Sequence, residues 1–299
     1  MWTETHTQTS YITVTVHYIA DDWTLIERVL ASDADLRHTG ANIKQAVYAI
    51  LTEYDIDTNK VVFVTDRGAN VLAAMKDSKH IPCCDHMINT VLTHLFDSSG
   101  LHDCPGIKSL LIASKELVRY FKKAGLMRHL STSLKQEVST RWNSVYYLLE
   151  SVLKNFDEIE HILRTKGESY RLVGIDKLLL QELTNFLEVF KFASEELEAT
   201  KQPTLHLALP WFYKIKQHCE ANDQDSDEMA AIKRRATTFV QTKFVLEPLH
   251  HVATVLNPKM KNMKMLQDND KQRVYDTLRV MLSHLTSRQL ATAEGKTGQ

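Results

Sequence analysis

The chain has 299 residues, enough for one large or two ordinary domains, and its 43% hydrophobic and 24% charged residues exclude an intrinsically disordered protein. A net charge of −1 excludes a chain that attracts nucleic acid over its whole surface, so any such surface must be local. Nine glycines and six prolines are few for this length and predict long helices with few elaborate loops.

Four cysteines, two of them adjacent, do not form a disulfide framework and favour a reducing compartment, the cytosol or the nucleus. The first ten residues carry no basic-then-apolar signal pattern, and no apolar run approaches the length of a membrane span. We therefore expect neither a secretory signal nor a membrane partner.

The N-terminal part predicts a strand pair and a helix. Residues 11–19 alternate apolar and polar side chains, as in a half-buried strand. Residues 23–30 form the returning strand after a turn at Ala20–Asp22. From Thr39 to Tyr54 the apolar residues recur at helical spacing, and Thr39 is the expected N-cap.

The stretch from Lys60 to His86 is the predicted centre of the fold. Val61–Val64 is a continuous apolar run, typical of a strand buried on both faces in a partly parallel sheet. Asp66 follows its carboxyl end, where open α/β sheets place their chemistry. The next predicted elements are a short helix, a second strand and another helix, over Val71–Lys76, Ile81–Cys83 and Met87–Phe96. Asp66 and the Cys83-x-x-His86 motif are therefore predicted to share one sheet edge.

From Gly106 onward the apolar period is helical nearly throughout. After a first helix that ends near Phe121, the predicted helices cover about 140–159, 177–200, 204–220, 228–256 and 271–286. Between Cys104 and Lys135, seven Lys and Arg residues against the single acid Glu116 leave a charge of about +6. This excess is either a solvated helix face or a surface that faces nucleic acid phosphates.

The side chains of the central stretch leave alternatives open. Asp66 is either a metal ligand or a turn former before Gly68, and a Mg²⁺ site needs more than one carboxylate. A zinc site would draw on Cys83, Cys84, His86, His102 and Cys104, but their spacing is not typical of zinc sites. A nucleophilic cysteine beside His86 lacks a third group to orient it.

Trp142 stands at a predicted helix start. A tryptophan there is most often a core anchor. Beside Arg141 it could instead offer a stacking face to a base.

Six segments in order resemble the hAT superfamily of DNA transposases and the BED-finger proteins descended from them. They are SYITVTVHYIADDWTL, VVFVTDRGAN, CCDHMINTVL, STRWNSVYYLLE, ATKQPTLHLALPWFYKIK and HHVATVLNPKMK. The resemblance covers the chain from Trp2 to about Lys261. It implies an RNase H-like catalytic fold, interrupted by a large all-helical insertion, in which three acids hold divalent metal and cut DNA.

The resemblance also implies roles for individual residues. Asp66 corresponds to the second metal-binding acid, which in the ancestral enzyme holds Mg²⁺ or Mn²⁺. Cys83 and His86 correspond to a Cys-x-x-His motif whose His lies beside the cleaved DNA. Arg141 and Trp142 correspond to a pair in the insertion whose Trp stacks near an unpaired base. We therefore expect Asp66 and His86 to be catalytic positions and Cys83, Arg141 and Trp142 to be nucleic-acid-binding positions.

The departures from the family pattern bear on activity. The first acid lies in an Asp-x-Trp-Thr segment, and Met1-Trp2-Thr3 begins one residue after its place. The third acid, a Glu after the insertion, is expected to lie beyond the chain, as are the dimerisation segment and any BED finger. With one acid of three, phosphoryl transfer would lose the charge stabilisation and water positioning that bound metal supplies.

The expected architecture is α/β plus all-α: a partial RNase H-like sheet of hairpin strands, a helix and a central strand, followed by a large helical insertion. The predicted parts are a partial catalytic domain over 1–97, a helical insertion domain over 98–290 and a frayed tail over 291–299.

The expected function is that of a hAT transposase-derived nuclear protein, with the cytoplasm as the alternative location. It would lack catalysis, hold no productive metal, take no small-molecule substrate, and bind DNA weakly or bind protein partners or itself. One alternative is a fragment of an active transposase that carries out metal-dependent cleavage and strand transfer. Another is a remnant without a stable fold, because missing strands would leave an open sheet edge.

Overall fold

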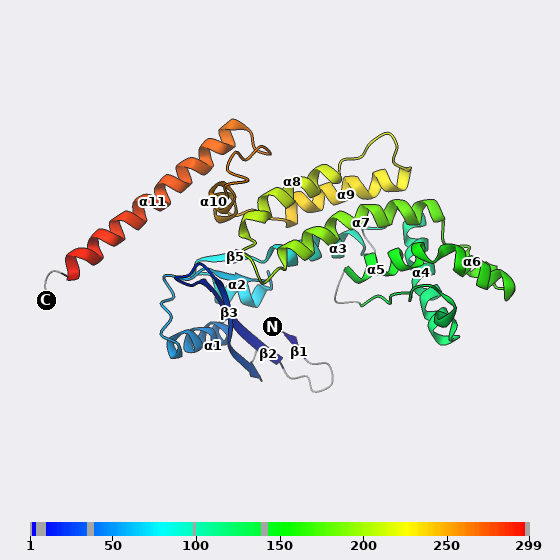
Figure 1. The fold of residues 1–299 in the computed structure, drawn as a ribbon, viewed down its shortest axis with the longest axis horizontal. Helices are drawn as coiled ribbons and strands as arrows, with labels where there is room; N and C mark the ends of the chain where they lie inside the picture. Colours follow the sequence, from blue (N-terminus) through cyan, green and yellow to red (C-terminus); the bar gives the residue numbers. More distant parts are fainter. Residues whose placement is uncertain (1, 4–9, 35–38, 98–99, 139–142, 297–299) are drawn as a thin grey trace. The chain divides into compact units, whose positions relative to one another are not determined.

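The computed structural model describes residues 2–3, 10–34, 39–97, 100–138 and 143–296 (Figure 1). The chain forms two compact units, the first of residues 1–87 with 198–205 and the second of residues 88–197 with 206–299. The predicted boundaries at residues 97 and 290 stay predictions. Across the described ranges, no helix combines the length and the apolarity that a bilayer span requires.

Among its described residues, the first unit holds two small sheets and two helices. The antiparallel sheet has the order β1-β2-β3, and the second sheet pairs β4 with β5 in parallel. Its elements are β1 (Trp2–Thr3), β2 (Ser10–Ile19), β3 (Leu25–Ala34), α1 (Gly40–Glu53), β4 (Phe63–Thr65), α2 (Ala69–Ala74) and β5 (His80–Pro82). The predicted hairpin, helix and parallel strand pair are therefore present.

Local chemistry explains where these elements begin. The hydroxyl of Thr39 accepts the N–H of Asn42 at 3.3 Å, which confirms the predicted N-cap of α1. The apolar stripe of α1 packs against β2 and α2, so the core of this unit lies between helices and sheet. The buried members of this core are Ile12, Ile43, Val47, Leu51, Ala74 and Met75.

The prediction that Val61–Val64 is buried on both faces is wrong. Val62 is 40% exposed and Val64 is 59% exposed, whereas Phe63 between them packs against the core beneath α1. Among the described residues, β4 pairs with β5 on one edge only. A strand with one neighbour cannot be covered as the middle strand of a sheet is, although its sequence has the composition of one.

Helices make up the second unit almost entirely. The helices from α3 onward are α3 (Cys84–Leu95), α4 (Pro105–Lys123), α5 (Asn143–Lys154), α6 (Phe156–Thr165), α7 (Lys177–Leu197), α8 (Ala208–His218), α9 (Asp227–Lys243), α10 (Pro248–Leu256) and α11 (Asp268–Lys296). The described residues also include the short 3₁₀ turns η1 (Leu126–His129), η2 (Ser169–Leu172) and η3 (Leu205–Leu207). With the first unit, this makes the described chain mostly helical with small sheets, as the sequence predicts.

The core of the second unit follows the predicted apolar stripes. In α4 the buried residues are Ile107, Leu110, Leu111, Ser114, Leu117, Val118 and Phe121. The start of α4 is bound by a distant carboxylate, since Glu228 of α9 accepts the N–H groups of Gly106 and Ile107 at 2.7 Å each. Two backbone donors that a helix start leaves unpaired are thereby satisfied.

The prediction of one helix from Glu228 to Leu256 is wrong. The structure has two helices there, because α9 ends at Lys243 and α10 begins at Pro248. Proline has no backbone N–H and disfavours the helical conformation in the residue before it, here Glu247. Pro248 is tolerated as the first residue of α10, where no helical hydrogen bond is lost.

Candidate functional site at the ends of β4 and β5

The carboxyl ends of β4 and β5 lie side by side. In the parallel pair, Val64 is opposite Ile81 and Thr65 is opposite Pro82. The backbone N–H of Cys83 donates to the carbonyl oxygen of Thr65 at 2.7 Å. Asp66 and Cys83 therefore occupy the next position on each strand, so the acid and the Cys-x-x-His motif do share one sheet edge.

Asp66 is half-buried and takes part in the turn that leads into α2. Its Oδ1 accepts the backbone N–H of Gly68 at 3.0 Å, which is the turn chemistry expected of an Asp two residues before a Gly. Thr65 donates its hydroxyl to the carbonyl oxygen of Asp66 at 2.8 Å, and it accepts from Nε2 of His80 at 2.6 Å. This hydroxyl and ring fix the strand end that carries Asp66.

The two cysteines at the start of α3 are neutral thiols at physiological pH. Burial raises the pKa of Cys83, although the backbone N–H of His86 acts to lower it. Burial, with the neighbouring Cys83 and Asp85, raises the pKa of Cys84 to about 12. Because the thiolate is the nucleophile and the metal ligand, these environments oppose both uses. His86 lies half-buried in the first turn of α3, next to the helix start.

The residues at this edge do not fit a catalytic metal ion. Within the described residues, no three His, Cys, Asp or Glu side chains come together in a group that could hold a metal. Asp66 already uses one carboxylate oxygen in its turn. Divalent metal sites for phosphoryl transfer take several oxygen ligands, and Asp66 alone does not supply them.

Two predicted site residues, Arg141 and Trp142, lie outside the described residues. The described chain resumes at Asn143, the first residue of α5. The roles predicted for all five site residues, as catalytic or nucleic-acid-binding positions, stay predictions.

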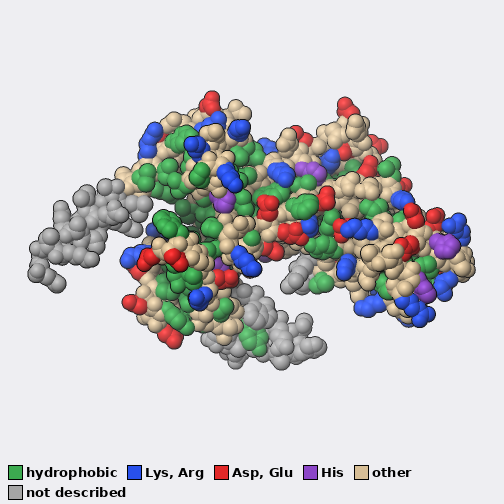
Figure 2. Space-filling model, in the orientation of Figure 1, with side chains coloured by type: hydrophobic (Ala, Val, Ile, Leu, Met, Phe, Trp, Pro, Cys, Tyr) green, Lys and Arg blue, Asp and Glu red, His purple; other side chains and the backbone are tan. Residues whose placement is uncertain are grey.

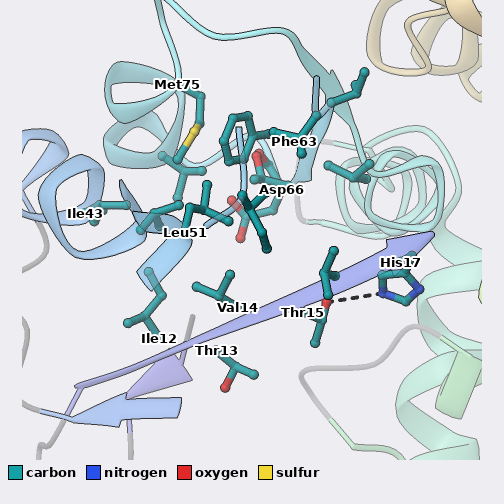
Figure 3. A pocket seen from close by; sticks show the side chains of 18 of the residues that line it. Ile12, Thr13, Val14, Thr15, His17, Ile43, Leu51, Phe63, Asp66 and Met75 are labelled. Atoms are coloured by element: carbon teal, nitrogen blue, oxygen red, sulfur yellow. Dashed lines mark hydrogen bonds between the residues drawn. The ribbon is translucent and has the colours of Figure 1, made fainter. Parts of the chain in front are cut away.

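A cavity that the sequence does not reveal lies beside Asp66. It has a volume of about 960 Å³ and is lined by residues 12–18 of β2, by residues 60–66 and by side chains of the α1 core (Figure 3). Figure 3 shows Asp66 and Phe63 on one side of this cavity and Val14 and Thr15 on the other. The sequence gives no direct signal for this cavity. The apolar strand β4 has too few neighbours to cover it, but this can be recognised only once the strand pairing is known.

A basic face is the second candidate site, formed by α4 and the segment that follows it to Lys135. Lys115 pairs with Glu137 at 2.7 Å, and Lys122 donates to Gln136 at 2.9 Å. The other basic residues of this face are exposed and have no salt bridge within the described residues: Lys108, Arg119, Lys123, Arg128 and Lys135. Figure 2 shows Lys and Arg side chains gathered over this part of the second unit, near α6.

Comparison with known proteins supplies relatives for most of the chain. Residues 1–96 match the family model described as the ZBED1 RNase-like domain. The chain is 30% identical to the Transposable element Hobo transposase of Drosophila melanogaster, over 79% of this chain and 36% of that protein. It is 25% identical to the Putative AC transposase of Zea mays, over 94% of this chain and 39% of that protein.

A zinc finger protein is also related. The human Zinc finger protein 618 is 25% identical over 76% of this chain and 24% of its own length. The matched part is thus between about a quarter and two fifths of each of these relatives. Together the matches confirm the predicted resemblance to transposases and to the zinc finger proteins related to them.

Proposed function

We propose that this chain, a relative of hAT transposases and of BED-type zinc finger proteins, is a transposase-derived nuclear protein that binds DNA through the basic face and does not cleave it. The observation that supports this proposal most strongly is a contrast between the two candidate sites of the protein, the one at the strand ends and the basic face. At the strand-end site Asp66 is the one acid that corresponds to a metal-binding position of the family, and the described residues hold no group of three side chains that could bind a metal. The basic face, in contrast, presents five exposed cations without salt bridges in the described chain.

A partial RNase H-like arrangement of the first unit is part of this proposal. The antiparallel hairpin, the helix α1 and the parallel pair β4–β5 follow the order expected of that fold. The family model that matches residues 1–96 is described as RNase-like, which supports the same arrangement. In this arrangement Asp66 stands at the carboxyl end of a central strand, where an RNase H-like enzyme would place a catalytic acid.

The proposed lack of DNA cleavage follows from the number of metal-binding acids. The resemblance requires three metal-binding acids, and Asp66 is the only one that matches a position in these 299 residues. Its carboxylate accepts the N–H of Gly68, so it has a structural role that needs no metal. Without bound metal, neither the attacking nor the leaving oxygen of a phosphodiester would be stabilised.

DNA binding rests on the charge of the basic face. Seven Lys and Arg residues against one acid lie between Cys104 and Lys135, in a chain whose total charge is only −1. The buried stripe of α4 fixes the orientation of this helix and leaves its cations toward solvent. Cations of one sign on one face attract the phosphate backbone without reading sequence, so the expected binding is weak and salt-dependent.

The test is a titration of the 299-residue protein into fluorescein-labelled duplex DNA, followed by anisotropy at about 50 and 200 mM salt. The variant Arg119→Glu/Lys123→Glu/Arg128→Glu reverses three charges on the basic face. The control Lys259→Glu/Lys261→Glu/Lys264→Glu makes the same charge change at three exposed lysines after α10.

The basic-face variant should weaken binding by tenfold or more and reduce the salt slope by about 1 for each cation removed. The control should bind within about twofold of the original protein. Equal losses in the two variants would show that the protein binds DNA by net charge alone and would overturn the assignment of the basic face.

A fragment of an active transposase is the second candidate, favoured by Asp66 and Cys83 at one sheet edge. Catalysis would then need carboxylates from outside these 299 residues. Incubation of this chain with labelled DNA and Mg²⁺ or Mn²⁺ separates the two candidates. Strand cleavage that disappears in Asp66→Asn would overturn the proposal of an inactive protein, whereas intact DNA supports it.

A further inference from the structure

Ser131 is an exposed residue within the basic face, three residues after Arg128. Protein kinases select substrates by the charges that flank the acceptor hydroxyl, and basic-directed kinases select an arginine three residues before it. In this sequence four hydroxyl side chains follow an arginine at that distance, namely Ser131, Ser144, Thr237 and Thr238. The structure separates these four positions.

The two threonines lie inside a helix, where phosphoryl transfer to them is hindered. The reaction needs the acceptor hydroxyl in line with the γ-phosphate of ATP and within reach of the catalytic Asp of the kinase. Thr237 is half-buried in α9, and its hydroxyl bonds to the carbonyl oxygens of Lys233 and Cys219 at 3.0 Å each. The hydroxyl of Thr238 donates to the carbonyl oxygen of Arg234 in the same helix at 3.3 Å. Either threonine would have to leave the helix before it could react.

The two serines also differ from each other. Ser144 is half-buried in the first turn of α5, and its hydroxyl bonds to both the N–H and the carbonyl oxygen of Val138. Ser131 instead follows the end of η1, where Leu130 has an extended backbone with φ of −104° and ψ of 144°. Residues 131–137 belong to no helix or strand. Ser131 is therefore the position of the four that can enter a kinase without the loss of a helix.

Two hydrogen bonds hold Ser131 against α6. Its hydroxyl donates to Oε1 of Glu158 at 2.5 Å, and its backbone N–H donates to Oε2 at 2.7 Å. These bonds, the hydroxyl first, lower the pKa of Glu158, so its carboxylate is ionised at neutral pH. A phosphate on Ser131 would remove the hydroxyl donor and place about two negative charges beside this carboxylate. Repulsion between the two groups would break the contact of Ser131 with α6.

The same phosphate would lie among the cations of the basic face. Ser131 is three residues after Arg128 and four residues before Lys135, both of them exposed. The stretch from Cys104 to Lys135 has seven Lys and Arg residues and one acid. A phosphate of about −2 would therefore lower its charge from about +6 to about +4. Such a change weakens the attraction of this face for another phosphate group.

We propose that Ser131 is a phosphorylation site for a basic-directed protein kinase, and that its phosphate releases residues 131–137 from α6 and weakens DNA binding by the basic face. The last of these effects rests on the proposed function. In the transfer, Oγ of Ser131 bonds to the γ-phosphorus of ATP as the bond to the β–γ bridging oxygen breaks. ADP leaves with that electron pair, and the hydroxyl proton passes to the catalytic Asp of the kinase.

The first test locates the phosphate. The folded 299-residue protein is incubated with Mg²⁺, ATP and the catalytic subunit of cAMP-dependent protein kinase, which is basic-directed, and is then analysed by mass spectrometry. Ser131 should be phosphorylated about tenfold faster than Thr237, or more. Free peptides of residues 125–137 and 231–241, which lack the fold, should both be phosphorylated. A folded protein that takes up phosphate at Thr237 but not at Ser131, or at neither while both peptides react, would overturn the proposal.

The second test measures hydrogen exchange in residues 131–137. Phosphorylation should speed exchange at the start of this segment by about tenfold or more, because the N–H of Ser131 loses a charged acceptor. Glu158→Gln keeps an acceptor oxygen but has no charge to repel the phosphate, so its increase should be smaller. Exchange that is the same before and after phosphorylation would overturn the release of the segment.

The third test is the anisotropy titration with duplex DNA. Phosphorylated protein should bind about tenfold more weakly than untreated protein, with a salt slope smaller by about 2. Ser131→Ala is the control, and its DNA binding should be the same before and after treatment with the kinase. Unchanged binding of the fully phosphorylated original protein would overturn regulation through Ser131.

Failure of the proposed function can be told apart from failure of this inference. Untreated protein that does not bind DNA would overturn the proposed function and, with it, the effect of the phosphate on DNA binding. The position of the phosphate and the release of residues 131–137 are measured without DNA. In that case they would still support or overturn Ser131 as the phosphorylation site.

Discussion

The two units differ in how completely their helices and strands bury apolar side chains and pair backbone hydrogen-bonding groups. In the second unit, side chains such as Phe121, Phe186 and Phe190 are buried almost completely between helices. In the first unit, Val62 and Val64 remain exposed and a cavity of about 960 Å³ borders two strands. A helix makes its backbone hydrogen bonds within itself, whereas a strand needs neighbours on both edges. A helical unit can therefore be closed with the residues it has, and a small sheet is the part that depends on further strands.

The largest loss of stability is expected when a large side chain is removed from the buried core of the second unit. Phe190→Ala removes a ring that is 1% exposed and packs edge-on against Phe186, with ring centroids 5.3 Å apart. We expect the second unit to lose about 3–5 kcal/mol of unfolding free energy, measured as lost hydrogen-exchange protection in its peptides. Peptides from residues 10–87 should keep their protection.

The control is the neighbouring ring on the same helix. Phe192 is 46% exposed, so Phe192→Ala should cost no more than about 1 kcal/mol. If Phe190→Ala lowers protection equally in both units, they unfold together and the comparison between them does not hold.

A pH dependence is expected from His250, a fully buried side chain of α10 in the second unit. Burial, with the nearby His251, lowers its pKa to about 4. Its Nδ1 accepts the N–H of Glu247 at 2.8 Å, a hydrogen bond that requires this nitrogen to be unprotonated. In the unfolded chain a histidine takes up a proton below about pH 6.5, whereas the folded protein resists protonation until about pH 4.

The stability contributed by neutral His250 is therefore complete above about pH 6.5 and is lost as the pH falls toward 4, by roughly 3 kcal/mol. Denaturant unfolding at several pH values should show this loss in the original protein and in His161→Gln, an exposed control on α6. His250→Gln should remove that part of the slope. A slope that is identical in all three proteins would exclude this assignment.

A smaller loss is expected at the start of α4. Glu228→Ala would leave the N–H groups of Gly106 and Ile107 without the carboxylate that now accepts both, at a cost of about 2–3 kcal/mol. Glu116→Ala, on an exposed position of α4, should change unfolding free energy by less than about 0.5 kcal/mol. Thermal unfolding of the two variants compares them, and similar midpoints would contradict a role of Glu228 in holding the helix start.

The smallest effect, of opposite sign, is expected in the open unit. Trp23 lies in the turn between β2 and β3, is 87% exposed and has φ of 68°. This left-handed conformation strains any residue with a Cβ, and the exposed ring gains little from packing. Trp23→Gly should therefore raise stability by about 0.5–1 kcal/mol, seen as slower hydrogen exchange in the hairpin. Faster exchange would mean that the indole makes a stabilising contact.

Much of the fold could be predicted from the sequence, because local patterns determine local elements. The spacing of apolar residues placed α1 and α4, and Thr39 gave the start of α1. Asp66 and Cys83 could be placed at one edge because parallel strands bring their carboxyl ends together. The helix break before Pro248 could also be predicted from the proline itself. The apolar residues recur at helical spacing across it, however, and this pattern favoured a single helix.

Other features depend on contacts between distant residues, and no local pattern contains them. Val61–Val64 has the composition of a central strand, but its burial depends on neighbours that its own residues cannot specify. The same limit applies to Glu228, whose partners in α4 are more than a hundred residues away along the chain. It applies to the cavity as well, since neither β2 nor β4 alone encloses it.

The long separation of Glu228 from α4 has a consequence for synthesis on the ribosome. Gly106 and its acceptor Glu228 are 122 residues apart, so at about 5–20 residues per second the carboxylate is made roughly 6–24 s after the helix it binds. During that interval the nascent α4 has two unpaired donors at its start and an uncovered apolar stripe. A chaperone that acts on this protein during translation would therefore meet α4 before α9 exists, and the helical unit can close only late in synthesis.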